Sequence, residues 1–257
     1  MSRPDHIRAP DPRDHPQSLD RVAQVDRIDH VVVAIPARDE EALLPGCLRS
    51  VSAAAAVLRG ARPGIRLSVA VALDGCTDRS AQVAAAEDVA TVTLPGAGVG
   101  AARDAAVECG LTALGRPAEG STWVACTDAD TVVPSSWLLR QVMWGERGVD
   151  LVVGTAEPVG VTRFAALAAW HARHRLVEGH THVHGANLGV RADRWRRVGG
   201  FGLLAVGEDV DLVERVRLAT DRWVATDTTR VLTSGRSHSR VEHGFAGYLL
   251  DLDADTG

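Results

Sequence analysis

The sequence predicts one α/β domain with a mostly parallel central sheet flanked by helices. Uninterrupted apolar runs, such as HVVVAIP at residues 30–36, are typical of strands that are buried on both faces of a sheet. These runs alternate with helical segments, and the alternation indicates βαβ units with right-handed crossovers. The chain has 257 residues, 46% of them hydrophobic, which is enough to bury a substantial core.

The first half of the chain follows this alternation element by element. Residues 1–28 hold several prolines among charged residues and few apolar ones, a composition that predicts a disordered tail. After the strand at 30–36, a helix is expected over residues 39–60, because this segment opens with acids that suit the positive end of the helix dipole and closes on Gly60. The next expected elements are a strand at 66–74, a helix at 78–87, a strand at 89–94, a glycine loop that enters a helix at 98–110, and a strand at 121–128.

The second half is less regular, and no linker divides it from the first. Its expected elements are a strand at 149–157, an amphipathic helix at 163–179, a strand that leads into a short helix at 181–193, a helix at 207–219, two short strands at 223–226 and 230–233, and a terminal helix from Gly244. The apolar side chains of the terminal helix suit either core packing or peripheral contact with a membrane surface; they are Phe245, Tyr248, Leu249 and Leu250.

Composition excludes several classes of function. A formal charge of -5, without a basic stripe, argues against a nucleic-acid partner. All 28 basic residues are arginine, which excludes a Walker-type phosphate loop, a Schiff base and a pyridoxal phosphate enzyme, since each of these needs a lysine. A GC-rich bacterial genome is the alternative explanation for this usage, because it would also suppress asparagine, and Asn187 is the only one.

The cysteines and the apolar profile predict a cytoplasmic protein. The cysteines are far apart and lack CxxC or zinc-finger spacing; they are Cys47, Cys76, Cys109 and Cys126. No secretory signal is visible, and no window approaches the roughly eighteen apolar residues that are needed to span a bilayer. We therefore expect no transmembrane anchor.

Carboxylates stand at the ends of two predicted strands, where parallel sheets bind ligands. Asp128 and Asp130 follow one strand, and residues two apart on an extended segment face the same side. Such a pair suits Mg²⁺ or Mn²⁺, which takes protein carboxylates together with phosphate oxygens and water. The alternative is an ordinary strand exit, in which Asp128 caps a turn and Asp130 is solvated. Asp74 ends another strand, where it could bind a ribose or base or form an Asx turn.

Seven motifs, taken in order, resemble the family 2 glycosyltransferases of the GT-A fold, a Rossmann-like architecture. They are VVVAIPARDEEALLPGCLRSV, VALDGCTDRS, GVGAARDAA, WVACTDADTVVPSSWL, GANLGV, VGGFGLLAVGEDVDLVERV and TSGR. The resemblance covers roughly residues 30–250, and its specificity lies in the order and spacing of the motifs. It implies one domain at residues 29–257, with a nucleotide-binding half at 29–131 and an acceptor-binding half at 132–257.

The resemblance implies a nucleotide-sugar donor, with a UDP-sugar preferred, held with Mn²⁺ or Mg²⁺ over the strand ends. The residues that would contact the donor are Pro36, Ala37, Arg38, Glu40, Asp74, Arg103, Asp128, Asn187 and Arg236. Asp128 and Asp130 match the DxD motif of the family, in which Asp130 would bind the metal directly and Asp128 would face the ribose or a metal-bound water. His238 or His243 would supply a further metal ligand.

The motif GEDVDL implies the catalytic step. It implies Asp209 and Glu208 as the catalytic residues, and Asp209 matches the residue that accepts the proton of an acceptor hydroxyl while attack inverts the anomeric centre. The alternative is that acids at a helix start serve stability alone. The motif GANLGV implies that residues 185–187 form the floor of the sugar or acceptor pocket. The acceptor itself is not indicated by any motif.

The sequence departs from the family pattern at two positions, and it leaves alternative sites and functions open. Asp39 and Asp104 stand where the family commonly has asparagine, and negative charge near a diphosphate would weaken donor binding. His180, His182 and His184 would share one face of a strand, as in a zinc site, but they lack a partner acid. The alternative functions are a non-catalytic nucleotide-sugar binding module and a sugar nucleotidyltransferase, although AIPARDEE lacks the glycine and the lysine usual in the latter.

Overall fold

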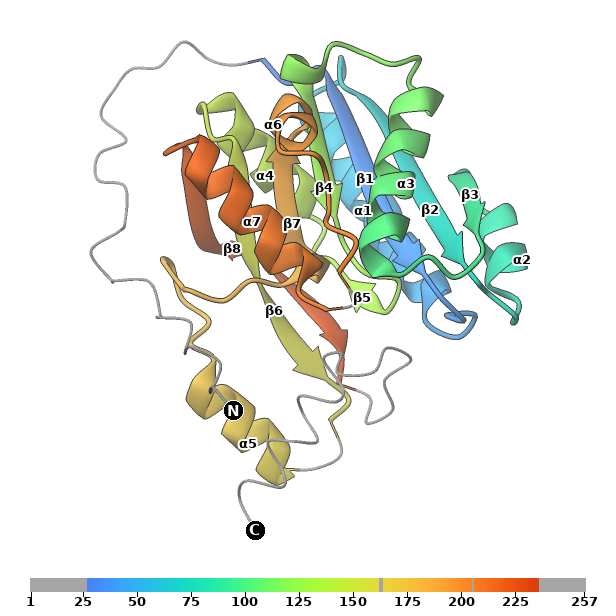
Figure 1. Cartoon of the computed structure of the whole chain (residues 1–257), viewed down its shortest axis with the longest axis vertical. Coiled ribbons are helices and arrows are strands. Elements are labelled where there is room, and N and C mark those ends of the chain that lie inside the picture. The colour runs from blue at the N-terminus through green and yellow to red at the C-terminus, as the bar shows by residue number, and fades with distance from the viewer. Residues whose placement is uncertain (1–26, 162–163, 205, 236–257) are drawn as a thin grey trace, which may run out of the picture.

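A computed structural model describes residues 27–161, 164–204 and 206–235, and it confirms the predicted α/β class (Figure 1). Its strands are β1 (His30–Ala37), β2 (Arg66–Asp74), β3 (Ala90–Leu94), β4 (Thr122–Cys126), β5 (Thr131–Val132), β6 (Leu151–Val159), β7 (Leu188–Arg191) and β8 (Trp223–Ser234). Its α-helices are α1 (Leu44–Ala61), α2 (Ser80–Ala85), α3 (Val99–Ala113), α4 (Trp137–Glu146), α5 (Phe164–Arg173), α6 (Ala192–Arg197) and α7 (Glu208–Ala219). Two short 3₁₀ helices are η1 (Glu119–Ser121) and η2 (Gly185–Asn187).

The described strands form one 8-stranded sheet in the order β3-β2-β1-β4-β7-β6-β8-β5. Strands β3, β2, β1 and β4 run parallel to one another, and β6 is parallel to β8. Strand β7 is antiparallel to both β4 and β6, and the short β5 is antiparallel to β8. The mostly parallel sheet is therefore confirmed. Because β1, β2 and β4 are parallel, their C-terminal ends meet at one edge of the sheet, and this edge carries the predicted site.

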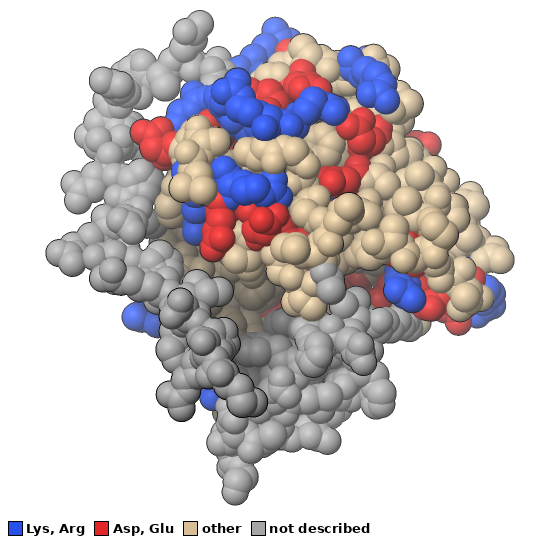
Figure 2. Space-filling view, viewed as in Figure 1, with Lys and Arg blue, Asp and Glu red and all other residues tan. Residues whose placement is uncertain are grey.

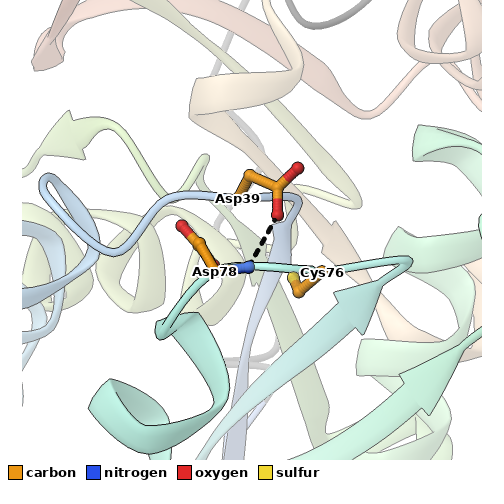
Figure 3. Close-up of side chains that lie close together, drawn as sticks. All are labelled: Asp39, Cys76 and Asp78. Atoms are coloured by element: carbon orange, nitrogen blue, oxygen red, sulfur yellow. Dashed lines mark hydrogen bonds between the residues drawn. The ribbon is translucent and has the colours of Figure 1, made fainter.

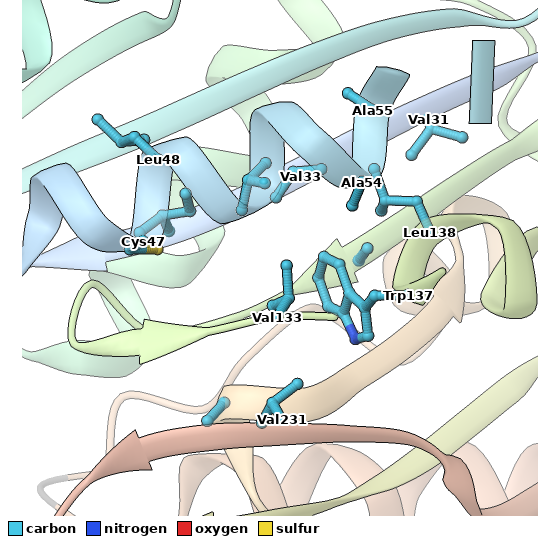
Figure 4. Packing of buried hydrophobic residues seen from close by; sticks show 14 of the residues in the cluster. Val31, Val33, Cys47, Leu48, Ala54, Ala55, Val133, Trp137, Leu138 and Val231 are labelled. Atoms are coloured by element: carbon cyan, nitrogen blue, oxygen red, sulfur yellow. The ribbon is translucent and has the colours of Figure 1, made fainter. Parts of the chain in front are cut away.

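Both faces of the sheet are covered by helices. Successive residues of β1 point to opposite faces, as expected for a strand. Val31 and Val33 pack among side chains of α1 and α4 (Figure 4), whereas Val32 packs against α3 on the other face. Helix α3 lies very close to β1, because a Cβ at Gly110 would overlap the side chain of Val32. This contact fixes the position of α3, which carries Arg103.

Helix α1 begins at Leu44 rather than at the predicted residue 39. Asp39 has a φ of 51°, in the left-handed region, and this conformation cannot continue into an α-helix. The amide of Glu40 instead donates a hydrogen bond to the hydroxyl of Ser80 over 2.7 Å. Pro45 then stands in the first turn, where its missing N–H has no helical partner. The acids that were expected to start the helix therefore belong to a turn that contacts the beginning of α2.

The second half differs from the prediction in several elements. Residues 181–187 were expected in a strand, but they form an irregular segment and η2, and β7 begins only at Leu188. The two short strands expected at 223–226 and 230–233 are one strand, β8, whose pairing with β6 shifts register between Gly154 and Ala156. Helix α5 ends at Arg173 instead of residue 179, and β5 was not predicted.

The beginning of the described chain differs from the prediction at Ile28. Ile28 was placed in the disordered tail, but it is 2% exposed and packs in the core. Residues 1–26 and the predicted terminal helix from Gly244 lie outside the described residues. No helix within the described part of the chain is long and apolar enough to cross a membrane. Arginine and carboxylate side chains are interspersed on the face seen in Figure 2.

Candidate active site

Asp128 and Asp130 lie in a turn between β4 and β5. The amide of Thr131 donates to the carbonyl of Asp128 over 3.1 Å, which closes the turn. The two acids therefore do not share one side of an extended segment, and that prediction is wrong, because β4 already ends at Cys126. The turn reverses the chain, so that β5 reaches strand β8 at the edge of the sheet.

Asp130 lies beside the end of β8. The hydroxyls of Thr131 and Thr233 each lie 3.4 Å from its Oδ1, and the amide of Ser234 donates to its carbonyl over 3.2 Å. The chain continues from here toward three of the predicted residues, but they lie outside the described residues; these are Arg236, His238 and His243. Their predicted roles as donor or metal ligands stay predictions.

Arg103 joins the acids of two motifs. It lies in the first turns of α3 and is only 3% exposed. Its Nη2 donates to Asp128 Oδ1 over 2.6 Å, and its Nη1 donates to Glu208 at the start of α7. The guanidinium also lies over the ring of Phe201, 5.7 Å from the ring centroid. The structure therefore brings three predicted site residues, from α3, the DxD turn and α7, into one ion-paired group.

The charges of this group determine its protonation. Burial lowers the pKa of Arg103, but the carboxylates of Asp128, Glu208 and Asp209 outweigh burial, so the net pKa is raised and the guanidinium stays charged. Burial also raises the pKa of Glu208, and the Arg103 guanidinium opposes this rise. One buried cation thus faces three carboxylates, and the surplus of negative charge favours the binding of a further cation.

Asp209 lies in the first turn of α7, next to this group. Its Oδ2 accepts a hydrogen bond from the amide of Gly185 over 2.7 Å, and its Oδ1 accepts one from the amide of Val210 over 2.9 Å. A Cβ at Gly185 would overlap the guanidinium of Arg103. Gly185, predicted as part of the pocket floor, therefore contacts both Asp209 and Arg103, and only glycine fits there.

Asp74 holds the loop that enters α3. It is 3% exposed, and its Oδ1 accepts hydrogen bonds from the amides of Gly96 and Ala97, over 3.0 and 2.6 Å. Its Oδ2 accepts one from the amide of Gly98 over 2.9 Å. Gly98 has a φ of 97°, which favours glycine, so this loop needs both its glycine and its buried carboxylate. The contact of Asp74 with a ribose or base stays a prediction.

The predicted donor residues after β1 differ in exposure. Pro36 and Ala37 end the strand and are buried, whereas Arg38 is exposed. Glu40 is 7% exposed and lies beside the start of α2 through its amide bond to Ser80. Among these four predicted residues, Arg38 therefore presents the solvent-accessible charge at this edge of the sheet.

Asp39 and Asp104, where the family commonly has asparagine, both accept hydrogen bonds from loops. Asp39 Oδ1 accepts from the amide of Thr77 over 2.6 Å, and this donor lowers the pKa of Asp39. Asp104 Oδ1 accepts from the indole N–H of Trp195 and from the amide of Phe201, each over 2.9 Å, and burial raises the pKa of Asp104. Each carboxylate thus has a structural function in this chain.

Three side chains of the kind that bind metals lie close together in Figure 3: Asp39, Cys76 and Asp78. Within the described ranges, this is the one such group whose atoms are close enough to share an ion. Asp39 Oδ1 accepts the amide of Asp78 over 3.2 Å, and the thiol of Cys76 donates to the carbonyl of Ala37 over 3.3 Å. Burial raises the pKa of Cys76, which keeps the thiol protonated and disfavours metal binding. These contacts indicate that the three residues hold two neighbouring loops together.

Asn187 is a core residue. It is 0% exposed, its Oδ1 accepts from the indole N–H of Trp137 over 2.9 Å, and its Nδ2 donates to the carbonyls of Thr155 and Thr229, each over 2.8 Å. A Cβ at Gly154 would overlap its amide, so the absence of a side chain at this position of β6 makes room for Asn187. All of the polar atoms of its side chain are engaged within the core, which leaves none for the predicted contact with the donor.

The histidines do not lie on a strand, contrary to the prediction. Among the described side chains, His180, His182 and His184 do not bring their ring nitrogens close enough together to share an ion. Sequence reasoning missed His174, which follows α5 and whose ring centroid lies 4.5 Å from that of His182. The available signal was the spacing of His174 four residues after Trp170 on a predicted helix.

Comparisons with known proteins agree with this architecture. The family model described as glycosyl transferase family 2 matches residues 32–188. No curated protein matches the chain significantly. Among solved structures, the mannosyltransferase PcManGT from Pyrobaculum calidifontis, in complex with GDP-Man and Mn²⁺, is similar with a TM-score of 0.58 and 18% identity. The match covers 95% of this chain and 68% of that one.

Two further structures are similar at low identity. Glucosyl-3-phosphoglycerate synthase from Mycobacterium tuberculosis, in complex with Mn²⁺, UDP and glucosyl-3-phosphoglycerate, has a TM-score of 0.55 and 18% identity over 87% of this chain and 80% of that one. S. aureus TarS 1–349, in complex with UDP, has a TM-score of 0.57 and 14% identity over 81% of this chain. The match spans only 61% of that TarS fragment. The family match over more than half of the sequence, together with the shared GT-A fold, shows that this chain belongs to glycosyl transferase family 2.

Proposed function

We propose that the chain transfers a sugar from a nucleotide-diphosphate sugar to a hydroxyl acceptor, with inversion at the anomeric carbon. One observation carries the proposal: Arg103 pairs with both Asp128 and Glu208, so the DxD turn and the start of α7 meet in one buried group. If Glu208 and Asp209 only stabilised the start of α7, a link from Glu208 through Arg103 to Asp128 would not be required. The donor would lie over the C-terminal ends of β1, β2 and β4, where ligands of parallel sheets bind.

The residues of the turn fit a divalent metal. Asp128 and Asp130 supply hard carboxylate oxygens, which suit Mn²⁺ or Mg²⁺ when phosphate oxygens and water complete the coordination. The surplus negative charge around Arg103 also favours a cation here. When bound, such a metal would stabilise the diphosphate leaving group. Asp130 is proposed as the direct ligand, and Asp128 as the residue that faces the ribose or a metal-bound water.

Asp209 is proposed as the base. It lies in the first turn of α7, and the N-terminal end of a helix interacts favourably with negative charge. The amide of Gly185 holds one carboxylate oxygen by a bond of 2.7 Å, which fixes the direction of the group. A carboxylate held in this way can accept the proton of the acceptor hydroxyl as that oxygen attacks. Glu208 does not take the proton; it compensates the charge of Arg103.

The other predicted residues are proposed to bind the nucleotide-sugar donor. Arg38 is exposed at the end of β1 and can bind a phosphate or the nucleotide base, while Pro36 and Ala37 form the apolar wall beneath it. Asp74 acts through the loop that it anchors, whose amides it holds next to the start of α3. The solved relatives bind UDP or GDP-Man by their descriptions, and we propose a UDP-sugar for this chain.

A thermal-shift screen of nucleoside diphosphates and nucleotide sugars, with and without Mn²⁺, tests the donor. A true donor at a hundredfold excess over its Kd should raise Tm by about 5–10 °C, and more with Mn²⁺ than without. Asp130→Ala should lose the Mn²⁺-dependent part of this shift. The exposed Asp88 offers a matched control, and Asp88→Ala should behave as wild type.

Donor hydrolysis in the presence of Mn²⁺ tests catalysis without an acceptor. Asp209→Ala should keep donor binding but lose roughly 10²–10⁴-fold in the rate of nucleotide release. Wild-type rates in this variant would refute the proposed base. Donor binding without turnover by the wild-type protein would instead identify a non-catalytic binding module, and release of pyrophosphate from a nucleoside triphosphate would identify a nucleotidyltransferase.

A further inference from the structure

Four histidines and a tryptophan form a cluster between the α5 region and the segment that precedes η2. The rings of Trp170 and His174 are stacked, with centroids 4.5 Å apart and planes at 3°. The ring centroid of His182 lies 4.5 Å from that of His174. His184 lies 6.2 Å from His174 and 6.4 Å from His182, and His180 lies 6.2 Å from His182. We call Trp170, His174, His182 and His184 the imidazole stack.

The imidazole stack supports the segment that orients Asp209. His184 directly precedes Gly185, whose amide donates to Asp209 Oδ2 over 2.7 Å. One end of this segment is held by His180, whose Nε2 lies 3.2 Å from the carbonyl of Val153 on β6. The other end is held by the turn in which the Asn187 amide donates to the His184 carbonyl over 2.9 Å. Between these two attachments, the segment rests on the stacked rings.

The rings of the stack are uncharged at neutral pH. Burial, together with the smaller effect of the neighbouring histidines, lowers the pKa of His182 to about 4 and that of His184 to about 3. Burial also lowers the pKa of His174, and Arg173 and His171 act in the same direction. Asp227 raises the pKa of His180 against the larger effect of burial. Within the part of the chain that the structure describes, the charged neighbours that act on His182 and His184 are other histidines, so a protonated ring there would meet the rings of its neighbours.

The arrangement favours a packing function over metal binding. Metal ligands present ring nitrogens toward a common point. Trp170 and His174 instead meet face to face, and His174 and His182 are tilted by only 35°. Within the described residues, the group that meets the distance requirement for a shared ion is the one at Asp39.

We propose that the imidazole stack positions Gly185, and through it Asp209, only while its rings are uncharged, so that acid reversibly inactivates the enzyme. This inference rests on the proposed role of Asp209. The histidines are positioning residues, because they act through the Gly185 amide and do not touch the reacting atoms.

The direction of the pH effect follows from the lowered pKa values. When the segment opens, a freed histidine has an ordinary pKa of about 6.5, whereas the closed stack keeps His182 neutral down to a pKa of about 4. The closed stack is therefore fully stable above about pH 6.5, and it loses stability as the pH falls from there toward 4. The turnover rate should fall over the same interval and recover when the pH is raised.

Variants of His182 separate ring packing from ring charge. His182→Phe keeps an aromatic ring but cannot be protonated, so the acid limb of its kcat profile should move down by about one pH unit. His182→Ala loses the ring and should lower kcat about tenfold at pH 7.5 while leaving the donor KM unchanged. His171 is exposed, meets Trp170 only at the edge of its ring and has the smallest of the effects on the pKa of His174, so His171→Phe is the matched control and should shift the profile much less than His182→Phe.

An NMR measurement tests the same idea without turnover. The Gly185 amide resonance should shift between pH 7 and 4.5 in step with the His182 ring in the wild type, and only at lower pH in His182→Phe. Because Asp209 is itself a nearby carboxylate, the difference between the two proteins is the decisive quantity. If donor is never turned over but this difference is seen, the proposed function fails and the stack stands. Identical Gly185 titrations in folded wild type, His182→Phe and a second variant, His174→Phe, would overturn the proposal.

Discussion

Arg103 donates one hydrogen bond to Asp128 over 2.6 Å and a second to Glu208, although these acids belong to different halves of the chain. The guanidinium is buried, so removing it leaves Glu208 as a buried carboxylate without its cation. Breaking a buried ion pair on one side costs about 3–5 kcal/mol. We expect Arg103→Gln to lower the free energy of unfolding by that amount in urea titrations at pH 7.

The control for this variant is an exposed ion pair. Arg196 lies on the surface and pairs with Glu108 over 2.9 Å and with Glu119. Exposed pairs contribute at most about 1 kcal/mol, so Arg196→Gln should be nearly neutral. Equal losses in the two variants would contradict the special role of Arg103.

Gly185→Ala tests the geometry of the site without changing any charged group. The added Cβ would overlap the Arg103 guanidinium, which cannot move aside easily because both of its nitrogens are engaged. A displacement of this kind can cost about 10²-fold in rate, so we expect kcat to fall to that extent. Gly120→Ala is the control, because a Cβ at that position would meet open space. Unchanged kcat in Gly185→Ala would show that the turn can shift freely.

Asn187→Ala should be among the more destabilising single substitutions in the chain. It removes the partners of one indole N–H and two carbonyls in the core, and each orphaned buried group costs about 1–3 kcal/mol. We expect the free energy of unfolding to fall by at least about 3 kcal/mol. Gln82→Ala, at an exposed amide of α2, should change it by less than about 0.5 kcal/mol. A small loss for Asn187→Ala would indicate that water replaces the lost amide.

The lowered pKa of Asp39 implies a pH-dependent contribution to the stability of the fold. The amide of Thr77 lowers the pKa of this carboxylate, so its contribution is complete above the ordinary value near 3.8 and is lost as the pH falls through the lowered pKa. Asp39→Asn should remove this acid dependence and leave stability between pH 5 and 7 nearly unchanged, since asparagine also tolerates a φ of 51°. Asp39→Ala should lose on the order of 1 kcal/mol, because alanine is strained there. Melting temperatures measured from about pH 2 to 7 distinguish these outcomes.

The parts of the fold that depend on local pattern were predictable. Buried runs such as β1 and β4 predict strands because both faces are apolar, and the helices between them follow from their length and periodicity. The start of α1 was not predictable, because the left-handed conformation of Asp39 depends on its hydrogen bonds to residues beyond α1. The small strand β5 exists because β8 pairs with it, and no local pattern encodes that pairing.

The candidate site shows the same division. Motif order made Arg103, Asp128, Glu208 and Asp209 candidates for the site, but it did not predict that Arg103 joins Asp128 to Glu208, because sequence does not show which distant charges become neighbours. The single asparagine was recognised as unusual, yet the sequence could not distinguish a pocket from the core. That distinction depends on the carbonyls of β6 and β8, which meet Asn187 only after the sheet has formed.

The position of β8 between β6 and β5 has a consequence for the growing chain. During synthesis from the N-terminus, the DxD turn and β5 emerge well before β8, which pairs with β5. Closing so long a loop costs chain entropy and slows folding. Glu208 is also made late, so a nascent chain halted before α7 holds Arg103 against Asp128 alone. We therefore expect the candidate active site to assemble after the β1 to β4 region has folded, and to be the part most exposed to proteases on the ribosome.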